Sequence, residues 1–287
     1  MGYMHINNLY KDQRILMFKE CYSLEKIHGT SAHVSWNANQ QKITYFSGGE
    51  KHEKFVSVFD NESLLEKFKE VSPNSNLTVY GEAYGGKCQG MSKTYGSELK
   101  FIGFDVKINE TWLSVPNAED VCNKLGLDFV FYRKVKTNIN TLDSMRDMFS
   151  VQAKINGCGG EKIQEGVILR PLVELKASNG ERIICKHKRS EFCETKTPRE
   201  VSPEQLQILT EAKEIAEEWV TEMRLNHVLD KLPSGIGLEN MKTIISSMVE
   251  DVYREAEGEI VKSVEVTKHI GMKTAQLFKQ KLHNQLH

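Results

Sequence analysis

Five short groups of ionisable or aromatic residues could together transfer a phosphoryl or nucleotidyl group. The groups are Lys26 with His28 in "EKIHGT", Glu82 in "VYGEAYGG", Phe104 with Asp105 in "FIGFDV", Glu165 with Arg170 in "EGVILRP", and Lys186 with Lys188 in "ICKHK". A lysine amine attacks phosphorus only when it is neutral, which costs about 4 kcal/mol near pH 7 for a lysine with the usual pKa of about 10.4. A neighbouring cation, such as a second lysine or a divalent metal, lowers this cost. Lys26 is therefore a candidate nucleophile.

Each group taken alone has an ordinary structural explanation. Lys26 could be a solvated charge on the edge of a strand, and a Lys-x-Lys strand usually exposes its lysines to water. The pattern Lys-x-x-Gly begins at six positions, which are Lys26, Lys87, Lys93, Lys100, Lys154 and Lys268. Only the combination of all five groups, in this order and on expected strands, indicates one kind of site.

In this order and at these separations the groups resemble the covalent nucleotidyltransferases, the superfamily of ATP-dependent polynucleotide ligases and mRNA capping enzymes. His28 stands where DNA ligases and capping enzymes typically carry aspartate. The form Lys-x-His-Gly-Thr is similar to the RNA ligases of the phage type that seals nicks in duplexes, and to the kinetoplastid RNA-editing ligases. The resemblance covers residues from about 20 to 190.

The resemblance also implies a role for each group. Lys26, Lys186 and Lys188 would be catalytic, with Lys26 bonded covalently to AMP and the other two lysines on the α-phosphate. Glu165 would help to bind Mg²⁺ or Mn²⁺, a hard cation that needs few protein ligands. Glu82 would hold the ribose hydroxyls and Phe104 would stack on adenine, although Phe101 competes for this role. The implied residues of the ATP site are Glu25, Lys26, Ile27, His28, Gly29, Glu82, Phe104, Glu165, Arg170, Lys186 and Lys188.

One feature departs from the pattern of these ligases. They usually carry an arginine between the first lysine and the glutamate group, whereas "YFSGGEKHEKFV" has none. Lys51 or Lys54 could substitute as a point charge, but lysine lacks the bidentate fork of arginine.

The resemblance implies an ATP-dependent RNA ligase that works in three steps. Lys26 is adenylylated, AMP passes to an RNA 5'-phosphate, and a neighbouring 3'-hydroxyl attacks and releases AMP. The implied substrate is RNA with these two ends, most closely a nick in duplex RNA, as in RNA repair. A DNA ligase is the second hypothesis, disfavoured by His28 and by the lack of an expected second β-barrel. A non-catalytic protein that binds nucleic-acid ends is the third, disfavoured because the charged positions are all present.

The elements that must position these groups are mostly short strands. From residue 21 to about 190, runs such as "LTVYGEAYG" and "LKFIGFDVKI" alternate with turns, for example "FSGGEK" and "KASNGER". Helices are expected in "NESLLEKFKEV" with a cap at Asn61 or Ser63, in "NAEDVCNKLGL" from Asn117 to near Gly126, and in "TLDSMRDMFSVQAKI". The expected fold is α+β, with an antiparallel-sheet-rich, ATP-grasp-like adenylyltransferase domain.

The remainder of the chain reads as helical. Ser202, Pro203 and Gln205 form the start of a long amphipathic helix that continues to Met223, and "KLPSGIG" ends it. A second helix begins near Met241, and "TKHIGMKTAQLFKQKLHNQL" is a third. We therefore predict an adenylyltransferase domain over 1–195, a linker in "ETKTPREVSP", and a small all-α domain over 200–287.

Composition bounds these inferences without choosing among them. The 287 residues are 39% hydrophobic and carry a net charge of −1, so the total charge neither supports nor excludes a nucleic-acid partner. Six cysteines without a Cys-x-x-Cys pair, and no signal-like amino terminus, predict a cytoplasmic protein with reduced thiols. No run approaches the roughly 20 apolar residues of a membrane span. We expect a monomer that does not bind membranes.

Overall fold

The computed structural model describes residues 2–177, 179–192, 200–232 and 236–284. The chain forms two compact units, the first from Met1–Asp12 and Glu20–Pro198, the second from Gln13–Lys19 and Arg199–His287. Most of the predicted linker, residues 193–199, lies outside the described residues. Among the described helices, none is long and apolar enough to cross a membrane.

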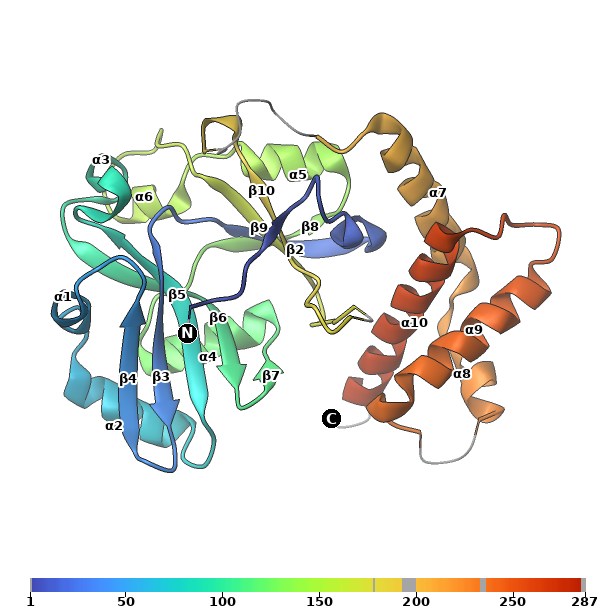
Figure 1. Ribbon diagram of the computed structural model, residues 1–287, viewed down its shortest axis with the longest axis horizontal. Coiled ribbons are helices and arrows are strands. Elements are labelled where there is room, and N and C mark those ends of the chain that lie inside the picture. Colours follow the sequence, from blue (N-terminus) through green and yellow to red (C-terminus); the bar gives the residue numbers. More distant parts are fainter. Residues whose placement is uncertain (1, 178, 193–199, 233–235, 285–287) are drawn as a thin grey trace. The chain divides into compact units, whose positions relative to one another are not determined.

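The first unit contains two five-stranded sheets (Figure 1). The β2 sheet has the order β1-β10-β9-β2-β8, with β1 (Asn7–Asn8), β2 (Glu20–Glu25), β8 (Tyr132–Lys136), β9 (Gly166–Pro171) and β10 (Cys185–Lys188). The β5 sheet has the order β4-β3-β5-β6-β7, with β3 (Thr30–Asn37), β4 (Lys42–Ser47), β5 (Leu77–Gly85), β6 (Leu99–Ile108) and β7 (Thr111–Trp112). Every pairing is antiparallel except that of β1 with β10. The predicted α+β class, rich in antiparallel sheet, is confirmed.

Helices join the strands of this unit. They are α1 (His52–Val56), α2 (Asn61–Val71), α3 (Ser92–Tyr95), α4 (Val115–Leu125), α5 (Ile139–Arg146) and α6 (Val151–Ile155), with 3-10 turns η2 (Cys88–Gly90) and η3 (Ser190–Phe192). The cap of α2 is Asp60, which accepts from the Ser63 N–H, so the expected cap at Asn61 or Ser63 was wrong. The helix α4 ends as predicted at Gly126, whose φ of 72° suits glycine.

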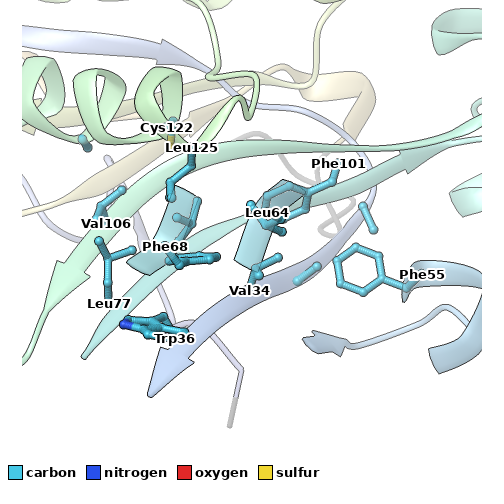
Figure 2. Packing of buried hydrophobic residues seen from close by; sticks show 14 residues of the cluster. Val34, Trp36, Phe55, Leu64, Phe68, Leu77, Phe101, Val106, Cys122 and Leu125 are labelled. Atoms are coloured by element: carbon cyan, nitrogen blue, oxygen red, sulfur yellow. The ribbon is translucent and has the colours of Figure 1, made fainter. Parts of the chain in front are cut away.

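The larger core of this unit explains the alternating pattern of its strands. Val34 and Trp36 on β3 and Leu77 on β5 face α2, where the Phe68 ring stacks on Trp36 at 6.0 Å (Figure 2). Phe101 on β6 packs into the same cluster and is 6% exposed. Side chains on the opposite face of these strands do not belong to this core.

Several expected elements end earlier than their sequence pattern. The expected helix in 141–155 is two helices, because the Ser150 hydroxyl accepts from the Ala153 N–H and starts α6 anew. The helix expected from Asn117 begins two residues earlier, at Val115. The turn in "FSGGEK" leads into α1 and not into a hairpin.

The second unit is a helical bundle. Its helices are α7 (Pro203–Trp219), α8 (Glu222–Asp230), α9 (Met241–Glu255) and α10 (Val264–Asn284), with the 3-10 turns η1 (Arg14–Met17) and η4 (Leu238–Asn240). Ser202 caps α7 as predicted, but the helix expected to reach Met223 stops at Trp219, and Thr221 caps α8. Sequence reasoning also missed η1, whose Ile15 and Leu16 are buried.

Candidate active site

Lys26 lies immediately after β2, not within a strand as expected. Its backbone N–H donates to the Gly166 carbonyl at 3.0 Å, which keeps it beside β9. The preceding residue is fixed independently: the Glu25 carboxylate accepts from Ser150 Oγ at 2.5 Å and from the N–H groups of Val151 and Gln152 at 3.1 Å. Burial raises the pKa of Glu25, and these hydrogen bonds counteract it. The Glu25 side chain therefore binds the first N–H groups of α6, which Ser150 caps, and holds the backbone before Lys26.

Glu165 gathers three nitrogen groups around one carboxylate. Its Oε2 lies 2.9 Å from Lys26 Nζ and 2.9 Å from His28 Nδ1, and its Oε1 lies 3.0 Å from Lys188 Nζ. Burial alone would raise the pKa of Glu165, but the hydrogen bonds from His28, Lys26 and Lys188 outweigh it and lower the pKa to about 2. Glu165 is thus ionised at neutral pH, and it brings together four of the residues expected at the site.

The His28 ring is held from two sides. Besides its contact with Glu165, it lies 5.3 Å from the Phe192 ring, and its backbone N–H donates to Tyr95 Oη at 3.4 Å. The side chain remains 30% exposed, so His28 is not simply a buried core histidine. The arrangement fits a residue that shapes the site by orienting Glu165.

Glu82 faces the same cluster from β5. Its strand pairs with β3 so that Glu82 lies opposite Ser31, and Gly29 makes the approach possible, because a Cβ there would come within 2.3 Å of the Ala83 carbonyl oxygen. Burial raises the pKa of Glu82 to about 7; the charge of Glu165 adds to this, while Lys26 opposes it. This carboxylate can therefore change its protonation state near neutral pH.

A cavity of about 420 Å³ opens beside Lys26, between residues of both sheets. Seven of the expected site residues line it: Glu25, Lys26, Ile27, Glu82, Phe104, Arg170 and Lys186. Phe104 is on this wall, whereas Phe101 belongs to the core in Figure 2. The other four expected residues, His28, Gly29, Glu165 and Lys188, are absent from the described lining. Of these, His28, Glu165 and Lys188 form the cluster, and Gly29 contacts Glu82.

Arg170 lines the cavity and also belongs to a buried network of ion pairs. It lies 3.0 Å from Asp105 Oδ1 and also contacts Glu174, while Arg182 lies 2.6 Å from Asp105 Oδ2 and 2.8 Å from Glu174. Buried charges need such partners, so Asp105 anchors this wall. Neither Lys51 nor Lys54, the candidates for the missing arginine, is among the described lining residues. Lys54 instead pairs with Glu50 at 3.2 Å.

Sequence reasoning missed the amino-terminal segment, which lines the cavity with Tyr3, Met4, His5 and Ile6. The Tyr3 hydroxyl donates to Asp105 at 2.6 Å, and its ring meets Phe104 edge-on at 4.9 Å. β1 then pairs with β10, where the Leu9 N–H donates to the Lys186 carbonyl at 2.8 Å. No local spacing signals these contacts, because they join residues about 100 or more positions apart.

A divalent cation fits this site only together with a phosphate-bearing ligand. Among the described residues, no group of three or more His, Cys, Asp and Glu side chains could hold a metal. Both oxygens of Glu165 already contact nitrogen groups. Mg²⁺ is commonly held by one or two carboxylates, substrate phosphates and water, which is the donor set that Glu165 and a bound nucleotide would provide.

The model of the RNA ligase family matches residues 19–188. This chain belongs to that family. Among solved structures, an apo mutant of Naegleria gruberi RNA ligase R4a is 14% identical to this chain, with a TM-score of 0.52. The match covers 67% of this chain and 57% of the Naegleria chain. A mutant of the Naegleria gruberi ligase with ATP and Mn is 13% identical, with a TM-score of 0.51 and coverages of 67% and 56%.

At this identity the likeness shows that the chain has the fold of these ligases, and the chain spans less than two thirds of their length. Among curated proteins, none matches. The predicted family is thus confirmed as RNA ligase. The closer resemblance to the duplex-sealing phage type and to the kinetoplastid ligases stays a prediction.

Proposed function

We propose that the chain is an ATP-dependent RNA ligase that forms a lysyl-AMP intermediate on Lys26. The observation that carries the proposal is the joint contact of Lys26, His28 and Lys188 with Glu165 at the edge of the cavity. A nucleophile, a second cation and a carboxylate therefore meet where a nucleotide has room to bind. Family membership and the ATP-bound structure of a ligase with the same fold support this choice.

ATP is proposed to occupy the cavity with its base against Phe104. The Glu82 carboxylate would accept hydrogen bonds from the ribose hydroxyls, and Lys186, on the same cavity wall, would contact the α-phosphate. Because His187 alternates with its neighbours on β10, Lys186 and Lys188 project toward the same side of the strand. Both lysines can then neutralise charge on the phosphates during transfer.

Lys26 must lose its proton before it attacks. Its Nζ lies 2.9 Å from Glu165 Oε2, close enough to donate a hydrogen bond to this carboxylate. A divalent cation held by Glu165 and the phosphates would supply charge neutralisation on the phosphates. Lys188 disfavours a second positive charge in the cluster, and Glu165 is close enough to Nζ to direct the leaving proton.

Three displacements at phosphorus follow. The Lys26 amine bonds to the α-phosphorus as the bond to pyrophosphate breaks and the amine proton leaves. An oxygen of the RNA 5'-phosphate then attacks the adenylyl phosphorus, the bond to Lys26 Nζ breaks, and the departing amine takes up a proton. Finally the 3'-hydroxyl attacks the 5'-phosphorus, loses its proton, and releases AMP. Positioning and charge stabilisation by Lys186 and Lys188 serve each displacement.

The proposed substrate is RNA with a 5'-phosphate and a 3'-hydroxyl, and specifically a nick in duplex RNA. The form of the first group, with His28, supports the duplex-sealing type. We also propose the domain division 1–195 and 200–287, with the helical domain contacting the duplex beside the nick, since A-form helices are recognised largely through their shape and backbone.

The test combines two assays on the full chain. Incubation with radiolabelled ATP and Mg²⁺ should give a covalent adduct, and nicked duplex RNA should be sealed faster than single-stranded RNA or nicked DNA. A chain that takes up no label would overturn the ligase mechanism. A labelled chain that seals DNA nicks fastest would assign the activity to DNA.

A further inference from the structure

Three large apolar side chains of the first unit lie on its surface. Phe149 is 51% exposed, Ile155 is 68% exposed and Ile163 is 36% exposed. Phe149 and Ile163 face each other across an isolated antiparallel bridge, so their side chains lie on one side of it. Ile155 ends α6, which begins two residues after Phe149 and is only about 6 Å long from Val151, at about 1.5 Å per residue. The three residues therefore belong to one short segment of the chain, residues 149–163.

Two lysines accompany these apolar side chains. Between 149 and 163 the chain carries Lys154, Lys162 and one acidic residue, Glu161. Neither lysine side chain makes a hydrogen bond or an ion pair with another described residue. The loop that joins Ile155 to Lys162 contains Gly157, Gly159 and Gly160, and a Cβ at any of the three would meet nothing within 4 Å. A polymer could approach this backbone closely.

The same segment is tied directly to the reactive cluster. Ser150, next to Phe149, donates to the Glu25 carboxylate, and Glu25 precedes Lys26. Ile163 lies two residues before Glu165, and the Ser150 N–H donates to the Lys162 carbonyl at 2.7 Å. A ligand on this surface would thus lie along the two segments that hold the nucleophile and its carboxylate partner.

We propose that Phe149, Lys154, Ile155, Lys162 and Ile163, the Phe149 surface, bind the RNA strand that ends in the 5'-phosphate. This rests on the proposed function and extends it by placing an RNA contact on the nucleotidyltransferase unit. A half-exposed aromatic ring offers a stacking platform for any base, and unpaired lysines attract the phosphates. Isolated apolar residues among free lysines and glycines suit a polyanionic strand better than the dry apolar centre of a protein interface.

The test measures RNA binding by the full chain without ATP, so that no adduct forms. The probe is a short, fluorescently labelled, single-stranded RNA with a 5'-phosphate, followed by anisotropy over a range of salt. Phe149→Ala should weaken binding by at least about fivefold, the loss expected of one base stack, while Phe149→Trp should keep it. The double change Lys154→Ala with Lys162→Ala should reduce the slope of log K against log salt by about 1.4, or about 0.7 for each phosphate contact.

Lys124→Ala is the matched control, since Lys124 is an exposed lysine on α4 that pairs with Asp120. It should change neither the affinity nor the slope.

Label uptake from ATP should be normal in every variant, because none of these residues lines the cavity. RNA binding unchanged in both the Phe149 and the lysine variants would overturn the proposal and favour a protein occupant. Equal losses for Phe149→Ala and Phe149→Trp, with a lower Tm, would also overturn it. Failure of the wild-type chain to take up label would count against the ligase mechanism alone.

Discussion

Glu165 contacts Lys26 and Lys188 through opposite oxygens, so one carboxylate sets the charge balance of the whole cluster. Bound phosphates and a divalent cation would add both negative and positive charge at the same place. A bound nucleotide would therefore change the electrostatic surroundings of Glu165, Lys26 and Lys188 at once.

The first prediction concerns this nucleophile. Lys26→Ala should abolish the covalent AMP adduct, because Lys26 is the only one of the six Lys-x-x-Gly lysines that contacts Glu165 and lines the cavity among the described residues. Lys87→Ala, Lys93→Ala and Lys268→Ala should leave it unchanged. The measurement is retention of label from ATP on the denatured protein. An adduct on the Lys26 variant would refute the assignment.

The second prediction concerns Glu82, whose pKa burial raises to about 7. The folded state then binds a proton more tightly than the unfolded chain does, so this group stabilises the protein at low pH. Its contribution is lost as pH rises from the unfolded pKa of 4.5 through 7. Glu82→Gln stays neutral, so it should raise Tm at pH 8 by roughly 2–4 °C and by less at pH 5.

Label uptake by Glu82→Gln should fall, because a neutral amide accepts more weakly from the ribose hydroxyls. Stability and activity would therefore change in opposite directions. An equal gain in Tm at both pH values would show that burial does not raise the pKa of Glu82. A fall in Tm at pH 8 would contradict the assigned direction of the pKa shift.

At the scale of the element, β6 separates a core residue from a cavity residue. Phe101 and Phe104 are an odd number of positions apart, so alternation directs them to opposite faces, although the register of β6 with β5 shifts at Phe104. The structure places Phe101 among the residues of Figure 2 and Phe104 on the cavity wall. Alternation alone could propose this division but not assign the faces, and the resemblance of "FD" to the ligase pattern favoured Phe104.

The third prediction follows from this division. Phe104→Ala should raise the KM for ATP roughly tenfold in the adenylylation assay with little change in Tm, because it removes a stacking partner and not a core residue. Phe101→Ala should instead destabilise the fold by about 3–5 kcal/mol, as expected for a buried phenylalanine. Thermal unfolding and adduct formation are measured on both variants. If the two effects were exchanged, the two roles would have to be exchanged as well.

The strands that carry site residues were predicted well because their alternation is local. "LTVYGEAYG" and "LKFIGFDVKI" match β5 and β6 along their full lengths. Helix ends were predicted less well, because a single hydroxyl decides them: Ser150 divides α5 from α6, and Thr221 divides α7 from α8. Periodicity alone continues through such caps.

The contacts that sequence could not predict are those between distant segments. Tyr3 with Asp105, Arg182 with Asp105, and β1 with β10 each join residues far apart in the chain. The candidate site was identified because its residue groups follow a fixed order along the sequence. The other residues that line the cavity follow no recognisable order. Local patterns therefore locate the candidate site residues, and only the fold reveals the cavity beside them.

At the scale of the molecule, the chain enters the second unit twice. Gln13–Lys19 belongs with Arg199–His287, and η1 of this segment packs against α7. The segment connects β1, which pairs with β10, to β2, which leads to Lys26. The helical unit is thus covalently linked to the first unit at three places, near residues 12, 19 and 198.

The last prediction tests the division of labour between the units. A chain ending at Pro198 should still form the Lys26 adduct, because the residues that line the cavity and surround Glu165 all belong to the first unit. It should seal nicked duplex RNA poorly, because the helices proposed to contact the duplex are gone. Adduct formation and sealing are measured side by side for both chains, at low and moderate salt.

Truncation also leaves the apolar side chains of η1 without the helices that bury them, so poor folding could mimic a loss of function. A second truncated chain with Ile15→Gln and Leu16→Gln removes that liability, because both residues are buried in η1 beside α7. If this chain is monomeric, melts cooperatively and forms the adduct at the wild-type rate, its sealing rate measures the contribution of the helical unit alone. Undiminished sealing would show that the helices serve another partner. A well-folded chain without adduct would show that the first unit needs the helical unit to bind or activate ATP.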